Sequence, residues 1–311
     1  MIAGTAAKGR MVLKGGVRLR ENRAGWLFAM PAVLGFAIFV LGPMIASLFY
    51  SFTDYAISGK WSFVGFGNYQ NMFSGKDIYF YKALGVTTKY VLMSVPLKIA
   101  YSFLLAMLLN QPVRGKSVFR TIFYLPTIVP TVAISMIWLW LLNPDFGLVN
   151  QMLRGIGLPA GKWIYAKESV IPSLAVMSVW TTGTITIVFL AGLQDIPRHL
   201  YEAMSLDGAG PFSRFRHVTV PMMTPTIFFN LCTTLIGSFQ VFSEAYIMTN
   251  GGPDNASLFY VFYLYREAFT NSRMGSACAI AWVLFLIILA VTVLVFKSSN
   301  KWVFYEGGRA S

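Results

Sequence analysis

The side chains best suited to chemistry in this chain are polar groups that interrupt long apolar stretches. Three of them, at positions 230, 233 and 234, share one face of a helix because they are three and four positions apart. Neutral hydroxyls and amides beside aromatic walls provide many hydrogen bonds and little charge, which suits a polyhydroxylated solute. One such stretch contains Ser178, Thr181, Thr182, Thr184 and Thr186, and a later one contains Asn230, Thr233, Thr234, Ser238, Gln240, Ser243 and Glu244.

These groups define a candidate solute path, although the same residue types also have a structural explanation. Serine and threonine inside a membrane helix hydrogen-bond to the backbone of their own helix or join neighbouring helices. The sequence leaves both explanations open for each hydroxyl. The candidate path comprises Lys98, Thr182, Asn230, Thr233, Thr234, Gln240 and Glu244.

Lys98 is the most unusual member of this set, because it falls near the middle of an apolar block. An ionised group at that depth is costly and is usually paired or functional. It is expected either to face a pore or a neighbouring subunit, or to extend its long side chain to the membrane surface. Lys89 lies nearer the end of the block and is expected to reach the surface. Glu244, near the outer end of its block, belongs to a vestibule or to the membrane interface.

The sequence lacks the residues that hydrolytic or metal chemistry would require. The chain contains no G-x-x-x-x-G-K-[ST] loop to cradle phosphates, no H-E-x-x-H and no G-x-S-x-G. The two histidines, His199 and His217, lie in one polar segment, and Cys232 and Cys278 lie in apolar blocks, where packing explains them. We therefore expect a protein that is not an enzyme and binds neither a metal nor a cofactor itself.

Composition indicates that long helices in a membrane position these groups. Hydrophobic residues make up 56% of the 311 residues and charged residues 12%, whereas soluble domains contain about 25% charged residues. Blocks of about 20 apolar residues cross a bilayer as helices. We predict an all-α polytopic membrane protein with six transmembrane helices, at about 26–52, 83–109, 121–142, 171–193, 222–248 and 274–296.

The distribution of positive charge predicts the orientation. Segments on the side of the N-terminus carry fifteen Lys and Arg residues, and segments on the opposite side carry eight. Because cytoplasmic segments are enriched in Lys and Arg, we expect the basic segment 1–25, the connection 194–221 and the tail 297–311 to be cytoplasmic. The formal net charge of +13 is then a sign of topology and gives no reason to expect nucleic-acid binding. The outer loops are either connectors or a surface for an extracytoplasmic partner.

A polar segment, 202–221, lies between the fourth and fifth predicted spans. Pro197 fits the first turn of a short helix that ends near Leu206, and Gly208 fits the left-handed position that ends a helix. Such a short helix must be held by contacts, because its intrinsic stability is low. We expect a docking surface for a soluble partner, although an ordinary helical loop would show the same pattern.

The spacing within this segment resembles the EAA loop of ABC importer permeases. Glu202-Ala203-Met204 is followed after three residues by Gly208, and after nine more by Val218-x-Val220-Pro221. The family pattern is Glu-Ala-Ala, three residues, Gly, nine residues and Ile-x-Leu-Pro. The departures at positions 204, 218 and 220 are apolar replacements that keep the spacing.

Other segments are similar to carbohydrate-type permeases of the maltose and glycerol-phosphate group. The resemblance covers about 26–296 and implies the shorter, six-span version of the type I ABC importer permease fold. The segments are Arg114-Gly115-Lys116 with Phe119-Arg120-Thr121 and Leu125-Pro126, Trp138-x-Trp140-Leu141-Leu142-Asn143-Pro144 with Gly147-Leu148-x-Asn150, and Thr249-Asn250-Gly251-Gly252-Pro253.

The resemblance implies a permease subunit of an ATP-driven, binding-protein-dependent importer of a sugar or oligosaccharide. Its implied partners are a second related permease subunit, two ATPase subunits that bind ATP and magnesium, an extracytoplasmic solute-binding protein and membrane lipid. Its implied location is the cytoplasmic membrane of a bacterium or archaeon. The residues expected to couple it to the ATPase are Glu202, Ala203, Met204, Asp207, Gly208 and Pro221.

The alternative is a secondary transporter driven by an ion gradient. That class of protein typically has inverted repeats, broken helices and buried carboxylates. The sequence shows no clear repeat, and no acidic residue falls near the middle of a predicted span.

Overall fold

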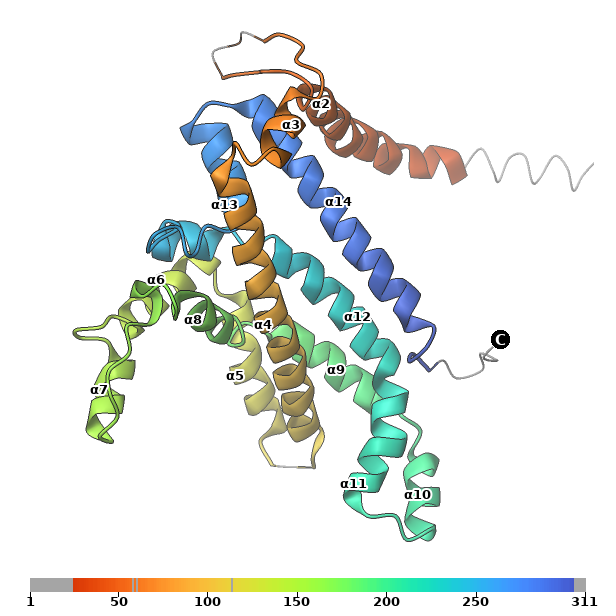
Figure 1. Ribbon diagram of the computed structural model, residues 1–311. Coiled ribbons are helices and arrows are strands. Elements are labelled where there is room, and N and C mark those ends of the chain that lie inside the picture. Colours follow the sequence, from red (N-terminus) through yellow and green to blue (C-terminus); the bar gives the residue numbers. More distant parts are fainter. Residues whose placement is uncertain (1–24, 58, 60, 113, 305–311) are drawn as a thin grey trace, which may run out of the picture.

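The computed structural model describes residues 25–57, 59, 61–112 and 114–304, and this part of the chain is mostly helical (Figure 1). An isolated antiparallel bridge joins Thr53 to Phe63. The fold class predicted from the sequence, all-α with several apolar helices, is confirmed. Residues 1–24 of the predicted basic segment 1–25, and residues 305–311 of the tail 297–311, lie outside the described residues.

Four of the described helices are long and apolar enough to cross a membrane: Gly25–Tyr50, α4 (Ile78–Asn110), Pro211–Phe239 and α14 (Met274–Ser299). They overlap the first, second, fifth and sixth predicted spans, although α4 begins five residues, and Pro211–Phe239 eleven residues, earlier than expected. Asp77 sets that start, because its carboxylate accepts hydrogen bonds from the N–H groups of Tyr79 and Phe80. The first helix ends in η1 (Ala37–Leu41) and α2 (Gly42–Tyr50), and the third consists of α11 (Pro211–Arg214), η3 (Phe215–Thr219) and α12 (Val220–Phe239).

Three predicted spans are not the continuous helices that hydropathy suggested. The block 121–142 is two helices, α5 (Lys116–Ile128) and α6 (Thr131–Leu141), which meet at an angle of 99°. The block 171–193 is divided into α8 (Val170–Met177) and α9 (Gly183–Asp195), and in the block 222–248 the helix ends at Phe239 before η4 (Ala245–Thr249). The count of six spans stays a prediction, because four described helices, or five with the bent pair, meet the criteria of length and hydropathy.

The helix α4 lies at the centre of the bundle and packs against α8, α9 and α12. Its buried face joins the main hydrophobic core through residues such as Tyr90, whose ring packs edge-on against Phe259. A backbone hydrogen bond of 2.8 Å from Tyr260 N–H to Thr87 Oγ1 fixes α13 (Tyr260–Tyr265) against the same helix. This central position lets α4 contribute to any site built between its neighbours.

The two ends of the bundle carry different short elements (Figure 1). At one end, α10 (Arg198–Leu206) and α11 lie on the same side as the connection between α4 and α5. The helix Gly25–Tyr50 extends away from the bundle, and it touches α14 through α2, where Trp282 Nε1 donates to Ser47 Oγ at 3.2 Å. The remaining short elements are α3 (Gly67–Phe73), α7 (Leu148–Gly155), η2 (Trp163–Tyr165) and η5 (Arg266–Thr270).

Candidate functional site

A polar cavity of about 440 Å³ lies where the three helix interruptions meet. Thr131 is the first residue of α6, Thr182 is the N-cap of α9, and Gln240 follows the end of α12, and all three line the cavity. A helix break inside a membrane frees backbone groups that lipid cannot satisfy, so breaks are tolerated where they line a cavity. A second cavity of about 130 Å³ shares Thr131, Ser178, Thr181 and Glu244 with the first.

Local sequence explains one of these breaks, and packing against another helix explains a second. Proline disfavours the helical conformation at the residue before it, and Val129, which precedes Pro130, is extended with ψ of 132°. At the other break, Gly183 packs so closely against α5 that a Cβ atom would lie 2.8 Å from the carbonyl oxygen of Phe123. The absence of a side chain at Gly183 therefore allows the start of α9 to lie directly beside α5.

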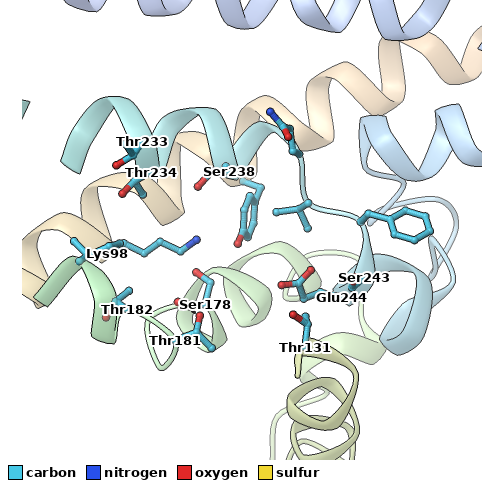
Figure 2. A pocket seen from close by; sticks show the side chains of 16 residues that line it. Lys98, Thr131, Ser178, Thr181, Thr182, Thr233, Thr234, Ser238, Ser243 and Glu244 are labelled. Carbon is cyan, nitrogen blue, oxygen red and sulfur yellow. Dashed lines mark hydrogen bonds between the residues drawn. The ribbon is translucent and has the colours of Figure 1, made fainter. Parts of the chain in front are cut away.

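Six of the seven residues of the predicted solute path line the larger cavity. The exception is Asn230, which is buried on α12 about one turn before the cavity and whose Nδ2 has no hydrogen-bond partner among the described residues. Figure 2 shows the hydroxyls of α12 facing those of the α8–α9 break across the cavity. The structure thus brings these residues together, and their role in transport stays a prediction. The six are Lys98, Thr182, Thr233, Thr234, Gln240 and Glu244.

The hydroxyl groups around the cavity fall into two classes. Thr182 and Thr233 hydrogen-bond to backbone carbonyls of their own helical turns, at 2.7 and 3.0 Å. For these two residues, the alternative of bonding within the helix accounts for the hydroxyl. Thr234 Oγ1 and Ser238 Oγ are buried and have no partner among the described residues. Because an unsatisfied buried hydroxyl costs about 1–3 kcal/mol, these two groups are available to a bound solute.

The cavity holds one cation and one carboxylate at opposite ends. Lys98 Nζ lies 5.8 Å from the centre of the Tyr90 ring, at the distance of a cation–π contact. Glu244 lies beside Thr131 at the other end (Figure 2). Among the described residues, neither Lys98 nor Glu244 has an ion-pair partner within 4.0 Å. Both charges face the cavity without forming a direct ion pair with each other.

Sequence reasoning missed two hydroxyl-bearing residues of this lining, Tyr90 and Thr131. Tyr90 lies eight residues before Lys98 on α4, which is a little over two helical turns and therefore nearly the same face. That spacing was a usable signal. Thr131 is the residue after Pro130, so the proline could have indicated that this hydroxyl begins a new helix.

The polar segment at the far end of the bundle forms the short helix predicted for it. Its last turn is a Schellman motif, in which Gly208 N–H bonds to Ser205 O at 3.1 Å and Ala209 N–H bonds to Met204 O at 2.9 Å. Gly208 has φ of 76°, the left-handed conformation expected at this position. Pro211 then begins α11, as expected of a proline at a first turn.

Contacts with α11–α12 hold this short helix in place. Tyr201 Oη and Thr219 Oγ1 are 2.9 Å apart, and Arg214 donates to Ser205 Oγ at 3.2 Å. A second hydrophobic core lies between α4, α9 and the start of α12, and Leu200, Tyr201 and Met204 pack against it. The opposite face is exposed and includes Glu202, Ala203 and Asp207, while Pro221 is half-buried at the start of α12.

A single helix joins the short helix to the cavity. Pro211–Phe239 is continuous over 29 residues, or about 40 Å at 1.5 Å per residue. Its first turns contact α10 through Thr219, and its last turns carry Thr233, Thr234 and Ser238 into the cavity. The short helix and the cavity are therefore joined by one continuous helix.

The described residues contain no cluster of three or more His, Cys, Asp or Glu side chains that could hold a metal ion. Cys232 is buried, Cys278 is half-buried, and both are free thiols. Burial within the bundle agrees with a packing role for both.

The fold and the cavity define a helical membrane protein with a polar interior site, and comparison with known proteins gives its class. Residues 98–303 match the family described as binding-protein-dependent transport system inner membrane component. The chain belongs to this family, so it is a membrane-embedded transport component.

Relatives with longer matches agree with this assignment. The chain is 39% identical to the probable ABC transporter permease protein YesP of Bacillus subtilis, over 92% of this chain and 94% of that protein. It is 32% identical to the arabinooligosaccharides transport system permease protein AraP of the same organism, over 90% of each. A bacterial ABC transporter involved in the import of the acidic polysaccharide alginate has a chain of the same fold, with a TM-score of 0.79, 26% identity and coverage of 91% of this chain and 99% of that one. These matches confirm the predicted ABC importer permease fold.

Proposed function

We propose that this chain is a permease subunit of an ATP-driven importer and that it forms half of the pore for a sugar or oligosaccharide. The observation that carries the proposal is that a hydroxyl-lined cavity and a docking helix with EAA-type spacing are joined by the one helix Pro211–Phe239. Membership of the binding-protein-dependent family supports it. The arabinooligosaccharides named for AraP and the alginate of the structural relative support a carbohydrate as the solute.

The proposed assembly supplies what this chain lacks. A second, related permease subunit completes the pore, and two ATPase subunits bind ATP and magnesium and hydrolyse the nucleotide. An extracytoplasmic binding protein delivers the solute to the side opposite α10. The chain crosses the cytoplasmic membrane several times with both termini in the cytoplasm, as the distribution of Lys and Arg residues predicts.

In the proposed mechanism, the exposed face of α10 with Glu202, Ala203 and Asp207 docks into a cleft of one ATPase subunit. The left-handed turn at Gly208 and the packing of Met204 hold that helix at a fixed angle to Pro211–Phe239. When ATP draws the ATPase subunits together, α10 moves with its partner. The difference in contacts between the two states shifts the pore between inward-open and outward-open forms.

The cavity end of the same helix binds the solute. Sugar hydroxyls both donate and accept hydrogen bonds, so they match the unsatisfied hydroxyls of Thr234 and Ser238. The Tyr90 and Phe242 side chains in the lining provide apolar area for the faces of the sugar ring. Movement of Pro211–Phe239 would displace one wall of the cavity relative to α4, which changes the access of the solute.

ATP-dependent uptake into proteoliposomes tests the proposal, with this chain reconstituted beside its permease, ATPase and binding-protein partners. Glu202→Lys should abolish uptake and co-purification of the ATPase, because it reverses a charge on the exposed face of α10. Glu168→Lys, at an exposed position in the α7–α8 connection, is the matched control and should leave both unchanged. Wild-type uptake by Glu202→Lys protein, or solute transport by this chain driven by an ion gradient without ATP, would overturn it.

A further inference from the structure

Positive charge around the cavity exceeds negative charge, and this excess affects which solute the cavity can bind. Two helices of 11 and 13 residues, α6 and α9, begin at the cavity, and neither start has a side-chain cap. The first N–H groups of a helix are unsatisfied and carry a partial positive charge. The cavity therefore has two positive helix ends in addition to the Lys98 amine.

Glu244 is the one carboxylate in the lining that can offset these positive charges. Its side chain lies beside Thr131, the first residue of α6 (Figure 2). A carboxylate near a helix N-terminus is stabilising and offsets its partial charge. Lys98 and Thr182, at the start of α9, line the same cavity, and Lys98 has no ion-pair partner within 4.0 Å among the described residues. One carboxylate cannot offset the Lys98 ammonium and two helix starts together, so the cavity as a whole retains positive charge.

Unsatisfied side chains in the same cavity indicate independently that a ligand belongs there. Thr234 Oγ1 and Ser238 Oγ belong to side chains that are 8% and 1% exposed, they face the cavity, and neither has a partner among the described residues. Both are hydroxyls, which suit a ligand rich in hydroxyls. Lys98 is half-buried and has no direct ion pair among the described residues, so a ligand that also carries an anionic group would give it a charge-assisted partner.

We propose that the cavity selects an acidic sugar, one that carries a uronate carboxylate. The carboxylate binds at the Lys98 and Thr182 end, between the ammonium group and the start of α9. The sugar hydroxyls reach Thr234 and Ser238, and those at the far end donate to the Glu244 carboxylate. The inference rests on the proposed function, because it names the solute class for the same cavity.

Direct binding to the full-length chain in lipid nanodiscs, without ATP or partner subunits, tests this selection. The probes are 4-linked digalacturonate and its neutral counterpart 4-linked galactobiose, measured by saturation-transfer NMR titration. Digalacturonate should bind about tenfold more tightly, since a charge-assisted hydrogen bond is about twice as strong as a neutral one. Lys98→Met should reduce digalacturonate affinity to the level of galactobiose.

Two further variants separate the role of this charge from its effects on folding. Lys89→Met removes an equal charge from an exposed position on the same helix and should keep the full preference. Lys98→Arg keeps the charge and should keep most of the preference for digalacturonate. Equal affinity for the two sugars, no saturable binding of either sugar, or a preference that survives Lys98→Met would overturn the inference. The proposed function would stand independently if ATP-dependent uptake of a neutral sugar were observed and remained sensitive to Glu202→Lys.

Discussion

Tyr201 on α10 and Thr219 at the base of the helix Pro211–Phe239 place their hydroxyl oxygens 2.9 Å apart. Thr219 is buried, so this contact is a sheltered link between α10 and the element that reaches the cavity. Because of this contact, the orientation of α10 depends on its packing against the helix Pro211–Phe239 and not on a free loop. Changes at the contact should therefore alter α10 while leaving the bundle intact.

The first prediction concerns this contact. Tyr201→Phe keeps the packing of the ring but leaves the Thr219 hydroxyl unpaired, which should weaken the docking of α10 by about 1 kcal/mol. Amide hydrogen exchange over 198–206 should become faster, and ATP-dependent uptake should fall. Tyr165→Phe is the control, because Tyr165 is exposed and its hydroxyl has no hydrogen bond among the described residues. Unchanged exchange over 198–206 would show that the contact does not hold the helix.

The second prediction concerns the backbone at Gly208. Its φ of 76° is unfavourable for residues with a Cβ atom, so Gly208→Ala should destabilise the end of α10 by about 1–2 kcal/mol. Gly210→Ala is a matched control two residues away, because its φ is −70° and a Cβ there would meet nothing within 4 Å. Retention of the ATPase during purification should fall for the first variant and stay normal for the second. Equal retention would mean that the left-handed turn does not set the docking geometry.

Sequence patterns predicted much of this site because of helical periodicity. Thr233 and Thr234 face the cavity together, and Lys98 lies on the central helix at the same level. Periodicity specifies direction around a helix but not where along it a cavity begins. Asn230 shares the predicted face and yet lies among packed side chains one turn too early.

The interruptions of the helices could not be predicted from hydropathy. Breaks at 129–130 and 178–182 do not interrupt the apolar blocks, so a window average assigns one span to each pair of helices. The break at Val129 had a local signal in Pro130. The close approach of Gly183 to Phe123 had none, because it depends on a helix from another part of the chain. Tertiary packing, not local propensity, fixes that break.

The third prediction tests that close approach. Gly183→Ala places a Cβ atom against the backbone of α5 near Phe123, which should cost about 1–3 kcal/mol as α9 is pushed away. Gly85→Ala on α4 is the control, since a Cβ there meets nothing within 4 Å and alanine favours a helix. Thermal unfolding in detergent should show a lower Tm for the first variant and an equal or higher Tm for the second. Equal Tm values for the two variants would contradict the close packing.

The fourth prediction concerns pH and the loop around Asp254. A hydrogen bond from Lys167, 2.8 Å away, together with the charges of Lys167 and Lys82, holds the pKa of Asp254 below its ordinary value. The pKa of Lys167 is raised by the same contact. Since Asp254 is stabilised as the anion, its contribution is present above about pH 4 and is lost as pH falls through its lowered pKa.

The Tm difference between the wild type and Asp254→Asn measures this contribution across pH. The difference should be present near neutral pH, vanish in acid below the lowered pKa, and shrink in 1 M salt because the pair is exposed. Asp145→Asn is the control, as Asp145 is exposed and has no ion pair among the described residues. A Tm difference for Asp254→Asn that stayed constant in acid would rule out the ion pair as its source.

The fifth prediction separates stability from transport at Ser238. The buried Ser238 hydroxyl has no partner among the described residues, so Ser238→Ala removes an unsatisfied polar group and should raise the free energy of unfolding by about 1 kcal/mol. Because that hydroxyl faces the cavity, the same variant should lower uptake by weakening solute binding. Ser102→Ala is the matched control, since its hydroxyl is also buried and unpartnered among the described residues but lies outside the cavity. It should raise stability and leave uptake unchanged. A stabilised Ser238→Ala protein with full uptake would show that the hydroxyl is not part of the solute path.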